Sequence, residues 1–348
     1  MKPPTPLYYT RCPVPTASGV AFQRGMFATS FHGTDYEVRD LSELGPDFKN
    51  AHYTHSVENF FREGGGAPPV WARANGVDSV VLGITFMEEL LGVFVRADDP
   101  AQDVAELAGR RLALPVWPRL VFNFWRFAAS KGFHSALAVH DLHDADVEFV
   151  DIIEDWDPHE RRNVGRCELA QPARCEYQNQ LAALLAGDVD AIFAKGPEAA
   201  LLQRDAGKRI RLLYDLRQAS AMAARVNNSM PRLLTTSRHL VEHHADAVIC
   251  YLRTLIRAVD WVQANTTQAR VLVARECSVE PAKIETYLEA NYADKFLPQV
   301  NDDLLEALAV MKRFLFERQF ISKDFDLDGW IDPTLLAEAH RLEGLAAQ

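Results

Sequence analysis

The chain reads Val189-Asp-Ala-Ile-Phe193-Ala-Lys-Gly-Pro197-Glu-Ala-Ala-Leu-Leu-Gln-Arg204 and then, after a polar turn, Ile210-Arg-Leu-Leu213. The two short apolar runs, 189–193 and 210–213, have the length and composition of buried strands. The segment between them, 197–204, is long enough for a helix. This part of the chain therefore predicts a strand, a helix and a second strand in succession.

The same alternation extends upstream. Residues 112–115 and 147–152 are predicted strands, and an aromatic-rich helix is expected between them over 120–130. Strands separated by helices of about ten residues are typical of parallel βαβ units. The polar stretch 154–174 follows neither period and is interpreted as a long loop. We therefore expect an α/β fold.

The regions on either side differ from this pattern. The N-terminal part contains four predicted strands and a helix over 14–27 in which Pro15 suits the first turn. The segment 52–69 is interpreted as a loop with one helical turn. Beyond Met222 the chain is predicted to be helical, beginning with a long helix capped by Thr236 or Ser237. The expected N-terminal strands are 7–10, 36–41, 80–85 and 90–95, and the later helices are 268–274, 281–290, 301–316 and 333–342.

Length and charge limit the classes of function. The chain has 348 residues, which favours two domains over a single core. Its net charge of −11, without a Lys/Arg-rich run, argues against a nucleic-acid partner. No apolar run approaches the roughly 18 residues of a membrane span, and no apolar region follows Lys2 as a signal peptide requires. Five scattered cysteines favour reduced thiols, so we expect a cytoplasmic protein without a membrane partner.

One cysteine stands in a position that favours reactivity. Cys12 follows the apolar run 7–10 and directly precedes prolines that are expected to start a helix. A lone cysteine is most often a small buried hydrophobe. At the N-terminus of a helix, however, the dipole and free N–H groups favour the thiolate form. Cys12 is therefore a candidate catalytic thiol.

A second cluster of polar residues lies in the sequence His52-Tyr-Thr-His55 and Arg62-Glu-Gly-Gly-Gly66. His52 and His55 have a spacing that could provide half of a metal site, but no third ligand is nearby, so we expect no metal. Arg62 beside three glycines suggests an oxyanion site, with bidentate guanidinium contacts and backbone N–H groups from a turn that glycine permits. The pattern His239-Leu-Val-Glu-His243 is interpreted as the solvated start of a helix rather than a zinc site.

Two motifs resemble those of a known fold. Ala105-Glu-Leu-Ala-Gly-Arg-Arg-Leu-Ala-Leu114 and Leu184-Leu-Ala-Gly-Asp-Val-Asp-Ala-Ile192 are similar to the second-lobe motifs of type 2 periplasmic-binding-protein folds. The similarity is to the branch with sulfonate-binding and thiamine-pyrimidine-synthase proteins. It implies a two-lobed fold with a cleft between the lobes and a helical C-terminal part. Lobe I is expected to comprise 1–98 plus 222–348, and lobe II 99–221.

A further resemblance concerns activity. Tyr9-Thr-Arg-Cys12-Pro-Val-Pro15 resembles the Tyr-Ser-Asn-Cys-Pro-Val-Pro run of the aromatic sulfinate desulfinases. His52-Tyr-Thr-His55 matches that family's His-Phe-Thr-Tyr, and Arg62-Glu-Gly-Gly65 matches its Arg-x-Gly-Gly at the same interval. The resemblance implies cofactor-free cleavage of a carbon–sulfur bond in an organic sulfinate, with release of sulfite. In that case Cys12 either attacks the sulfinate sulfur or protonates the carbon that loses SO₂.

The resemblance also implies roles for the neighbouring residues. His52 and Arg62 would orient the sulfinate and balance its charge, while the N–H of Gly65, next to Gly64, would bind one oxygen. Thr10 keeps the hydroxyl of the family serine. Two more expected substrate-binding residues lie at strand ends of the second lobe, where α/β folds bind ligands. They are Trp117, with Arg119 as its alternative, and Lys195.

The substrate itself is expected to differ from the family's. Its tryptophan-containing stretch is replaced here by Ile192-Phe-Ala-Lys-Gly196. We therefore expect a hydrolase acting on carbon–sulfur bonds, a monomer with a small anionic substrate, and no cofactor. One alternative is a solute-binding protein of an ABC transporter for a sulfonate or similar anion. Another is a thiamine-pyrimidine synthase, but the cysteine-rich iron motif of that family is missing and we expect no pyridoxal phosphate.

Overall fold

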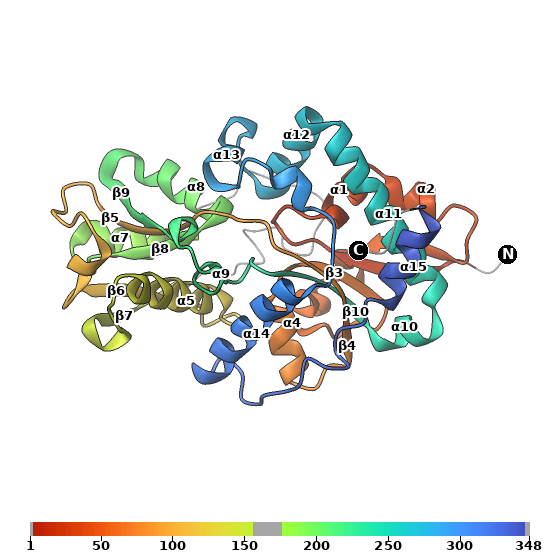
Figure 1. Ribbon diagram of the computed structural model, residues 1–348, viewed down its shortest axis with the longest axis horizontal. Coiled ribbons are helices and arrows are strands. Elements are labelled where there is room, and N and C mark those ends of the chain that lie inside the picture. The colour runs from red at the N-terminus through yellow and green to blue at the C-terminus, as the bar shows by residue number, and fades with distance from the viewer. Residues whose placement is uncertain (1–2, 156–175, 345–348) are drawn as a thin grey trace.

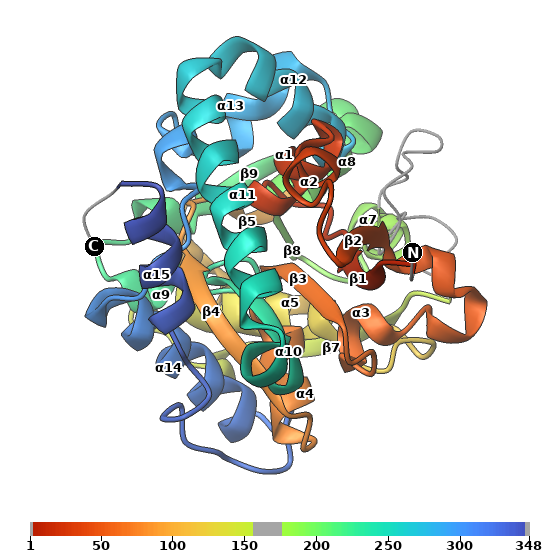
Figure 2. The same ribbon diagram turned by 90° about the vertical axis from the view of Figure 1, so that its right-hand side faces the viewer.

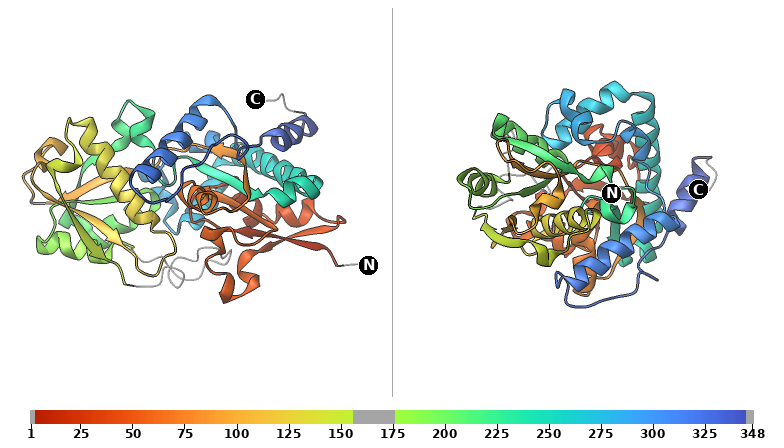
Figure 3. Two further views of the ribbon diagram at one scale, coloured as in Figure 1. Left: turned by 90° about the horizontal axis from the view of Figure 1, so that it is seen from below. Right: turned by 60° about the vertical axis from the view of Figure 1, so that its left-hand side comes forward.

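The structure is a computed structural model that describes residues 3–155 and 176–344. Figure 1 shows an elongated α/β molecule with sheets at both ends. The left view in Figure 3, seen from below, shows the same separation, with strands and helices at each end. The α/β class predicted from the sequence is confirmed. The predicted loop 154–174 lies almost entirely outside the described residues.

The first sheet has five strands in the order β2-β1-β3-β10-β4. β1 pairs in parallel with β2 and β3, whereas β10 runs antiparallel to β3 and β4. The sheet thus brings the N-terminal strands together with one strand from far along the chain. The strands are β1 (Thr5–Thr10), β2 (Tyr36–Asp40), β3 (Phe60–Gly65), β4 (Ser79–Thr85) and β10 (Arg232–Ser237).

The central strand β3 corrects one prediction. The sequence was interpreted as a loop here, yet all six residues of β3 are buried in a strand. Arg62, Glu63 and two glycines interrupt the apolar pattern by which a buried strand is normally recognised. Pairing with β1 on one side and β10 on the other stabilises the strand despite its composition. The sequence also gave no indication of β10.

The second group of strands contains a three-stranded sheet, β8-β5-β9, and a parallel pair, β6-β7. The expected parallel arrangement is confirmed for β6 and β7. β8 and β9 are not neighbours, because β5 lies between them and runs antiparallel to both. β5 precedes the boundary expected after residue 98 and pairs with two strands that follow it. The strands are β5 (Leu91–Arg96), β6 (Arg111–Val116), β7 (Glu148–Ile153), β8 (Ile192–Lys195) and β9 (Ile210–Asp215).

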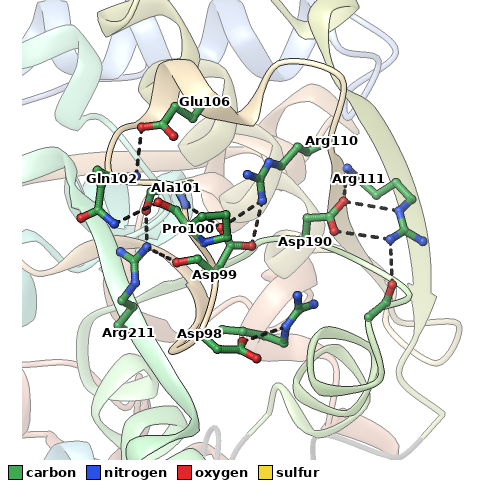
Figure 4. Close-up of polar contacts among 12 residues, drawn as sticks. Asp98, Asp99, Pro100, Ala101, Gln102, Glu106, Arg110, Arg111, Asp190 and Arg211 are labelled. Atoms are coloured by element: carbon green, nitrogen blue, oxygen red, sulfur yellow. Dashed lines mark hydrogen bonds and ion pairs between the residues drawn. The ribbon is translucent and has the colours of Figure 1, made fainter.

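The two fold motifs of the second group contact each other. Arg111 at the start of β6 donates from its backbone N–H and its guanidinium to Asp190, and its Nη2 donates to the Gly187 carbonyl at 2.7 Å. Next to this pair, Arg110 donates to the buried Asp99 at 2.8 and 3.0 Å (Figure 4). These paired charges explain why arginines follow Gly109 and why an aspartate precedes β8.

Helices cover both groups of strands. α11 packs against α1, α2 and α15 beside the first sheet (Figure 2). α5 packs on β6 and also contacts β5 and β8. The predicted C-terminal helical part is confirmed. The helices are α1 (Ala17–Gln23), α2 (Met26–Ser30), α3 (Ala51–Thr54), α4 (Ala67–Ala74), α5 (Phe124–Val139), α7 (Gln178–Ala186), α8 (Gly196–Ala206), α9 (Met222–Arg225), α10 (Arg238–His243), α11 (Ala245–Ala264), α12 (Thr266–Cys277), α13 (Ile284–Tyr287), α14 (Asp302–Glu317) and α15 (Thr334–Leu342).

Two predicted helix starts are wrong. α1 begins at Ala17, not near Pro15, because the Thr16 side chain accepts from the Gly19 N–H at 3.0 Å and caps the helix. The prolines instead shape the short connection that follows Cys12. The aromatic helix α5 begins at Phe124 rather than at 120, with the Asn123 side chain as its cap. Ser237 does cap a helix, as expected, but that helix is the short α10.

None of the helices in the described part of the chain is both long and apolar enough to span a membrane.

Candidate active site

Cys12 lies just beyond the end of β1, beside β3. The parallel register pairs Thr10 with Arg62, which places the residues after Thr10 next to Gly64 and Gly65. A Cβ atom on Gly64 would stand 2.6 Å from both Cβ and Sγ of Cys12. Only glycine therefore allows the thiol to lie directly against β3. Cys12 is 9% exposed, so the residue is largely buried but retains some exposed surface.

Arg62 is a buried cation that has no ion-pair partner in the described part of the chain. It is 1% exposed, and its Nη1 donates to the Gly65 carbonyl at 3.0 Å. Within residues 3–155 and 176–344 no carboxylate forms an ion pair with it. Burial lowers the pKa of Arg62, while Cys12, Tyr53 and Tyr9 act in the opposite direction. Its Nη2 would lie 3.6 Å from a Cβ on Gly64, on the same side of the strand as the Cys12 thiol.

The neighbouring carboxylate, Glu63, does not neutralise Arg62. Successive side chains of a strand point to opposite faces. Glu63 accepts from the backbone N–H of Ser18 at 2.8 Å, at the N-terminus of α1. Burial raises the pKa of Glu63, and the hydrogen bonds from α1 oppose that shift. Glu63 therefore anchors α1 to the sheet and leaves the Arg62 charge uncompensated.

His52 is held in place by Thr10. It lies on α3, is 3% exposed, and its Nδ1 is 2.8 Å from the Thr10 hydroxyl oxygen. The Tyr53 ring packs edge-on against the imidazole, with 4.9 Å between ring centroids. These contacts fix the orientation of the imidazole ring. Thr10 is thus a positioning residue for His52, not a member of the cavity wall.

A cavity brings three predicted residues together with residues from distant parts of the chain. Cys12, His52 and Arg62 line it together with Lys195 from the end of β8. The cavity therefore lies between the first sheet and the second. The remaining lining residues are Pro13, Val14, Tyr53, Pro68, Phe124, Glu198, Asn228 and Ser229.

Lys195 has several buried partners, unlike Arg62. Its Nζ lies 3.4 Å from Glu89 and 3.5 Å from Glu198, and it donates to the Ser229 hydroxyl at 3.0 Å. Glu89 also pairs with Arg232 at 3.3 Å. Lys195 thus reaches the cavity, as the sequence predicted, but its charge is shared with two carboxylates.

Other predicted residues are placed differently. Trp117 is 2% exposed and stacks on Trp125 with 4.5 Å between ring centroids, outside the cavity lining. Its alternative, Arg119, pairs with Asp155 at 3.4 Å at the surface. Gly65 belongs to β3 rather than to a turn, and a Cβ there would lie 2.8 Å from the Asn228 carbonyl oxygen. The glycines therefore permit close approach of the chain instead of a left-handed turn.

Sequence reasoning missed the polar residues of the far wall. Asn228 and Ser229 belong to the segment 227–230, which connects α9 to β10 and is closed by backbone hydrogen bonds between Asn227 and Met230. Glu198 lies in the first turn of α8. The only signal in the sequence was a run of short polar residues before a proline. Asn228 and Ser229 come near Cys12 because β10, which follows them, pairs with β3, more than 160 residues earlier in the chain.

His55 is buried and unpaired. It was expected to line the pocket or lie at the surface, but it is 4% exposed and does not belong to the cavity lining. Neither ring nitrogen has a hydrogen-bond partner within the described ranges, and its backbone is left-handed at φ 52°. Burial and the positive charge of Arg62 lower its pKa well below 6.5. His55 is therefore a neutral core histidine at neutral pH.

The histidine patterns of the sequence form no metal site among the described residues. The described residues contain no group of three His, Cys, Asp or Glu side chains that could hold a metal ion. His239 and His243 lie on α10, where their rings contact each other at 4.9 Å between centroids. Cys12, Cys250 and Cys277 are free thiols.

Comparison with known proteins identifies the class of fold. No model of a known protein family matches the sequence. The structure is similar to the periplasmic aliphatic sulphonate-binding protein SsuA from Escherichia coli, with a TM-score of 0.60, 18% identity, and coverage of 94% of this chain and 91% of that chain. The two-lobed periplasmic-binding-protein class that the motifs indicated is therefore the class of this fold.

A more specific similarity follows. The sequence is 26% identical to 2′-hydroxybiphenyl-2-sulfinate desulfinase of Rhodococcus erythropolis over 354 aligned residues, 95% of this chain and 92% of the relative. The structure is also similar to a cysteine-to-serine mutant of the desulfurization enzyme DszB in complex with biphenyl-2-sulfinic acid. The TM-score is 0.74 at 23% identity, with 97% and 99% of the two chains covered. The desulfinase-like motifs thus form part of a similarity along nearly the whole chain.

Proposed function

We propose that this protein cleaves the carbon–sulfur bond of an organic sulfinate and releases sulfite, with Cys12 as the catalytic thiol and without a cofactor. The observation that carries the proposal is the pairing of a shielded thiol with a buried, unneutralised guanidinium on the same side of Gly64. The similarity to a sulfinate desulfinase over 95% of the chain supports it.

Electrostatics favours an anionic substrate. A buried charge is costly unless an opposite charge or several hydrogen bonds compensate it. Among the described residues, the side chain of Arg62 has one hydrogen-bond acceptor, the Gly65 carbonyl, and its Nε is buried without a partner. A sulfinate offers two oxygens that match the fork of a guanidinium. Arg62 would then bind the sulfinate, and the N–H of Gly65 would take one oxygen.

Two chemical routes use this arrangement, and both convert R–SO₂⁻ and water to R–H and HSO₃⁻. In the first, the Cys12 thiolate attacks sulfur, an S–S bond forms as the C–S bond breaks, and the carbon takes a proton. Water then hydrolyses the Cys–S–SO₂⁻ intermediate. In the second, the Cys12 thiol protonates the carbon, SO₂ leaves and is hydrated, and the thiolate regains its proton. Both require the thiol beside the reacting group.

His52 has the position of a proton carrier in either route. It lines the same cavity as Cys12, and Thr10 fixes its Nδ1. The bond to Thr10 leaves the ring in one orientation, which is what a general acid or base requires. We therefore assign His52 to proton transfer and charge balance, and Arg62 to binding of the sulfinate.

The organisation of the molecule fits the same proposal. We propose two lobes built on the two groups of strands, with β5 in lobe II and the cavity between the lobes. We further propose that the protein is a cytoplasmic monomer of the hydrolase class. Free thiols at Cys12, Cys250 and Cys277 support a reducing compartment.

The test is a sulfite-release assay over a panel of aryl and alkyl sulfinates. Wild type is expected to release one sulfite for each hydrocarbon product. The Cys12→Ser variant should lose at least about 10³-fold in turnover because a serine hydroxyl is a poor nucleophile and acid at this position. Its folding is checked by circular dichroism. Full turnover by Cys12→Ser would refute the assigned chemistry.

A second candidate function is sulfonate binding without chemistry. The fold similarity to SsuA supports it, because Arg62 would suit a sulfonate as well as a sulfinate. The adjacent Cys12 thiol favours the enzyme, since a binding site for an inert anion has no use for a nucleophile. Tight binding of alkanesulfonates together with no sulfite release from any sulfinate would favour the binding protein.

A further inference from the structure

We propose that the cavity holds a polar subsite opposite Cys12, centred on Asn228, which selects a single-ring arenesulfinate that carries a hydroxyl group. This inference rests on the proposed function for the sulfinate end of the substrate. It adds which substituent the rest of the substrate carries. The residues that would contact this substituent are Asn228, Ser229, Lys195 and Glu198, which line the cavity.

The Asn228 side chain has hydrogen-bonding capacity that the protein does not use. Asn228 is 7% exposed, and its Oδ1 is buried without a donor among the residues that the structure describes. Its backbone groups, by contrast, are paired: the carbonyl accepts from the Gly66 N–H at 2.7 Å and the N–H donates to the Asn227 side chain at 2.8 Å. A buried amide in an aqueous cavity wall without a partner costs stability unless a ligand supplies one. A hydroxyl, which both donates and accepts, fits either orientation of the amide.

The segment that carries Asn228 is held from both sides of the cavity. Asn227 donates from its side chain to the Ala128 carbonyl of α5 at 3.0 Å. Ser229 accepts from Lys195 at 3.0 Å. The Asn228 carbonyl accepts from the backbone N–H of Gly66, the residue that directly follows β3. The amide is therefore presented on a fixed support, as a specificity-determining group requires.

The middle of the cavity suits an aromatic ring. Tyr53 and Phe124 stack on each other with 5.6 Å between centroids, and both line the cavity together with Pro13, Val14 and Pro68. The rest of the lining includes polar residues and the charged Lys195 and Glu198. A second phenyl ring next to them would bury these charged groups against hydrocarbon. One ring with a polar substituent is complementary to the whole cavity.

The chemistry of the bond cleavage favours the same substituent. In the protonation route, the carbon that bears the sulfinate accepts a proton and becomes part of a cationic ring. A hydroxyl group ortho or para to that carbon donates electrons into the ring and stabilises this cation. The substituent that Asn228 would bind is thus one that also eases loss of SO₂.

The test compares a hydroxybenzenesulfinate with the methylbenzenesulfinate of the same shape. Wild type is expected to prefer the hydroxyl compound by at least about 10-fold in kcat/KM, because an unmatched buried amide disfavours the methyl group. Asn228→Leu keeps the number and branching of the side-chain heavy atoms and the backbone hydrogen bonds, so it should fold normally and reduce the preference to the intrinsic reactivity difference.

Binding provides a readout that does not depend on turnover. In the Cys12→Ser background, the hydroxyl compound should bind about 10-fold more tightly than the methyl compound, and Asn228→Leu should remove that difference. Equal dissociation constants for the two compounds, or a preference unaffected by Asn228→Leu, would overturn the subsite. So would turnover of biphenyl-2-sulfinate as fast as the hydroxyl compound. Absence of sulfite from every sulfinate would refute the proposed function instead.

Discussion

Arg62 and Arg232 lie on neighbouring strands of one sheet, each only 1% exposed, yet their surroundings differ. Arg232 on β10 pairs with Glu89 at 3.3 Å, and Lys195 shares that carboxylate. Arg62 on β3 has no ion-pair partner in the part of the chain that the structure describes. The charge of Arg232 is therefore neutralised within the protein, whereas the charge of Arg62 is available to a bound anion.

The difference separates a structural charge from a ligand-binding charge. A paired buried charge matters for stability mainly because removing one partner leaves the other buried and uncompensated. An unpaired buried charge lowers stability until an anion arrives, so its retention needs a functional reason. The thiol of Cys12 beside Arg62 supplies that reason, because the same anion is then placed for reaction.

The largest effect on activity should come from replacing Arg62. Arg62→Met removes the guanidinium but keeps an unbranched side chain, so kcat/KM for a sulfinate should fall by roughly 10²–10³-fold. The free energy of unfolding should remain equal or rise, because an uncompensated buried charge is lost. Steady-state kinetics and urea denaturation measure the two quantities. A large loss of stability would mean that Arg62 is structural.

Arg232→Met provides the matched opposite case. This substitution leaves Glu89 buried with Lys195 as its nearest cation, so we expect a loss of about 3 kcal/mol in the free energy of unfolding. Urea denaturation measures the loss directly. Stability equal to that of wild type would remove the distinction between the two arginines.

A smaller effect is expected at Thr10. Thr10→Val removes the hydroxyl that lies 2.8 Å from His52 Nδ1 and should lower kcat by about 10-fold through misorientation of the ring. Thr10→Ser keeps the hydroxyl and should retain activity. If His52 is a proton carrier, the Thr10→Val profile of kcat against pH should also shift relative to that of Thr10→Ser. Equal profiles for the two variants would refute the positioning role.

The smallest effect concerns pH and His55. Its pKa in the folded protein lies well below 6.5, so the unfolded chain takes up a proton first as pH falls. Stability is thus fully present above pH 6.5 and decreases below it, by about 1.4 kcal/mol per pH unit, until the folded-state pKa is reached. His55→Asn tolerates the left-handed backbone and does not titrate. It should flatten the dependence of unfolding free energy on pH in this window.

The sequence allowed much of the fold to be predicted because most strands carry a local apolar signal. β1, β2 and β4–β7 were expected near their observed positions. β3 and β10 were missed for a physical reason. β3 contains Arg62 and Glu63 at buried positions, and its stability comes from partner strands rather than from its own composition.

The candidate site was predicted in part for a related reason. His52 and Arg62 are ten residues apart in the sequence, and Cys12 lies just beyond β1, the strand that pairs with β3. The motif resemblance linked all three residues. The cavity confirms that all three come together. Asn228 and Glu198 carry no local signal, and only tertiary structure brings them to the same cavity. Trp117 shows the converse: a strand-end position alone did not direct its side chain into the cavity.

The claim that Arg62 retains its charge for the sulfinate can be tested by ligand-induced thermal stabilisation. The measurement uses Cys12→Ser with and without Arg62→Met, titrated with an arenesulfinate that Cys12→Ser cannot turn over. We expect Tm to rise with ligand concentration in Cys12→Ser, as mass action requires, and to stay constant when Arg62→Met is added. An equal rise in both variants would contradict the account, because the anion would then bind without the unpaired arginine.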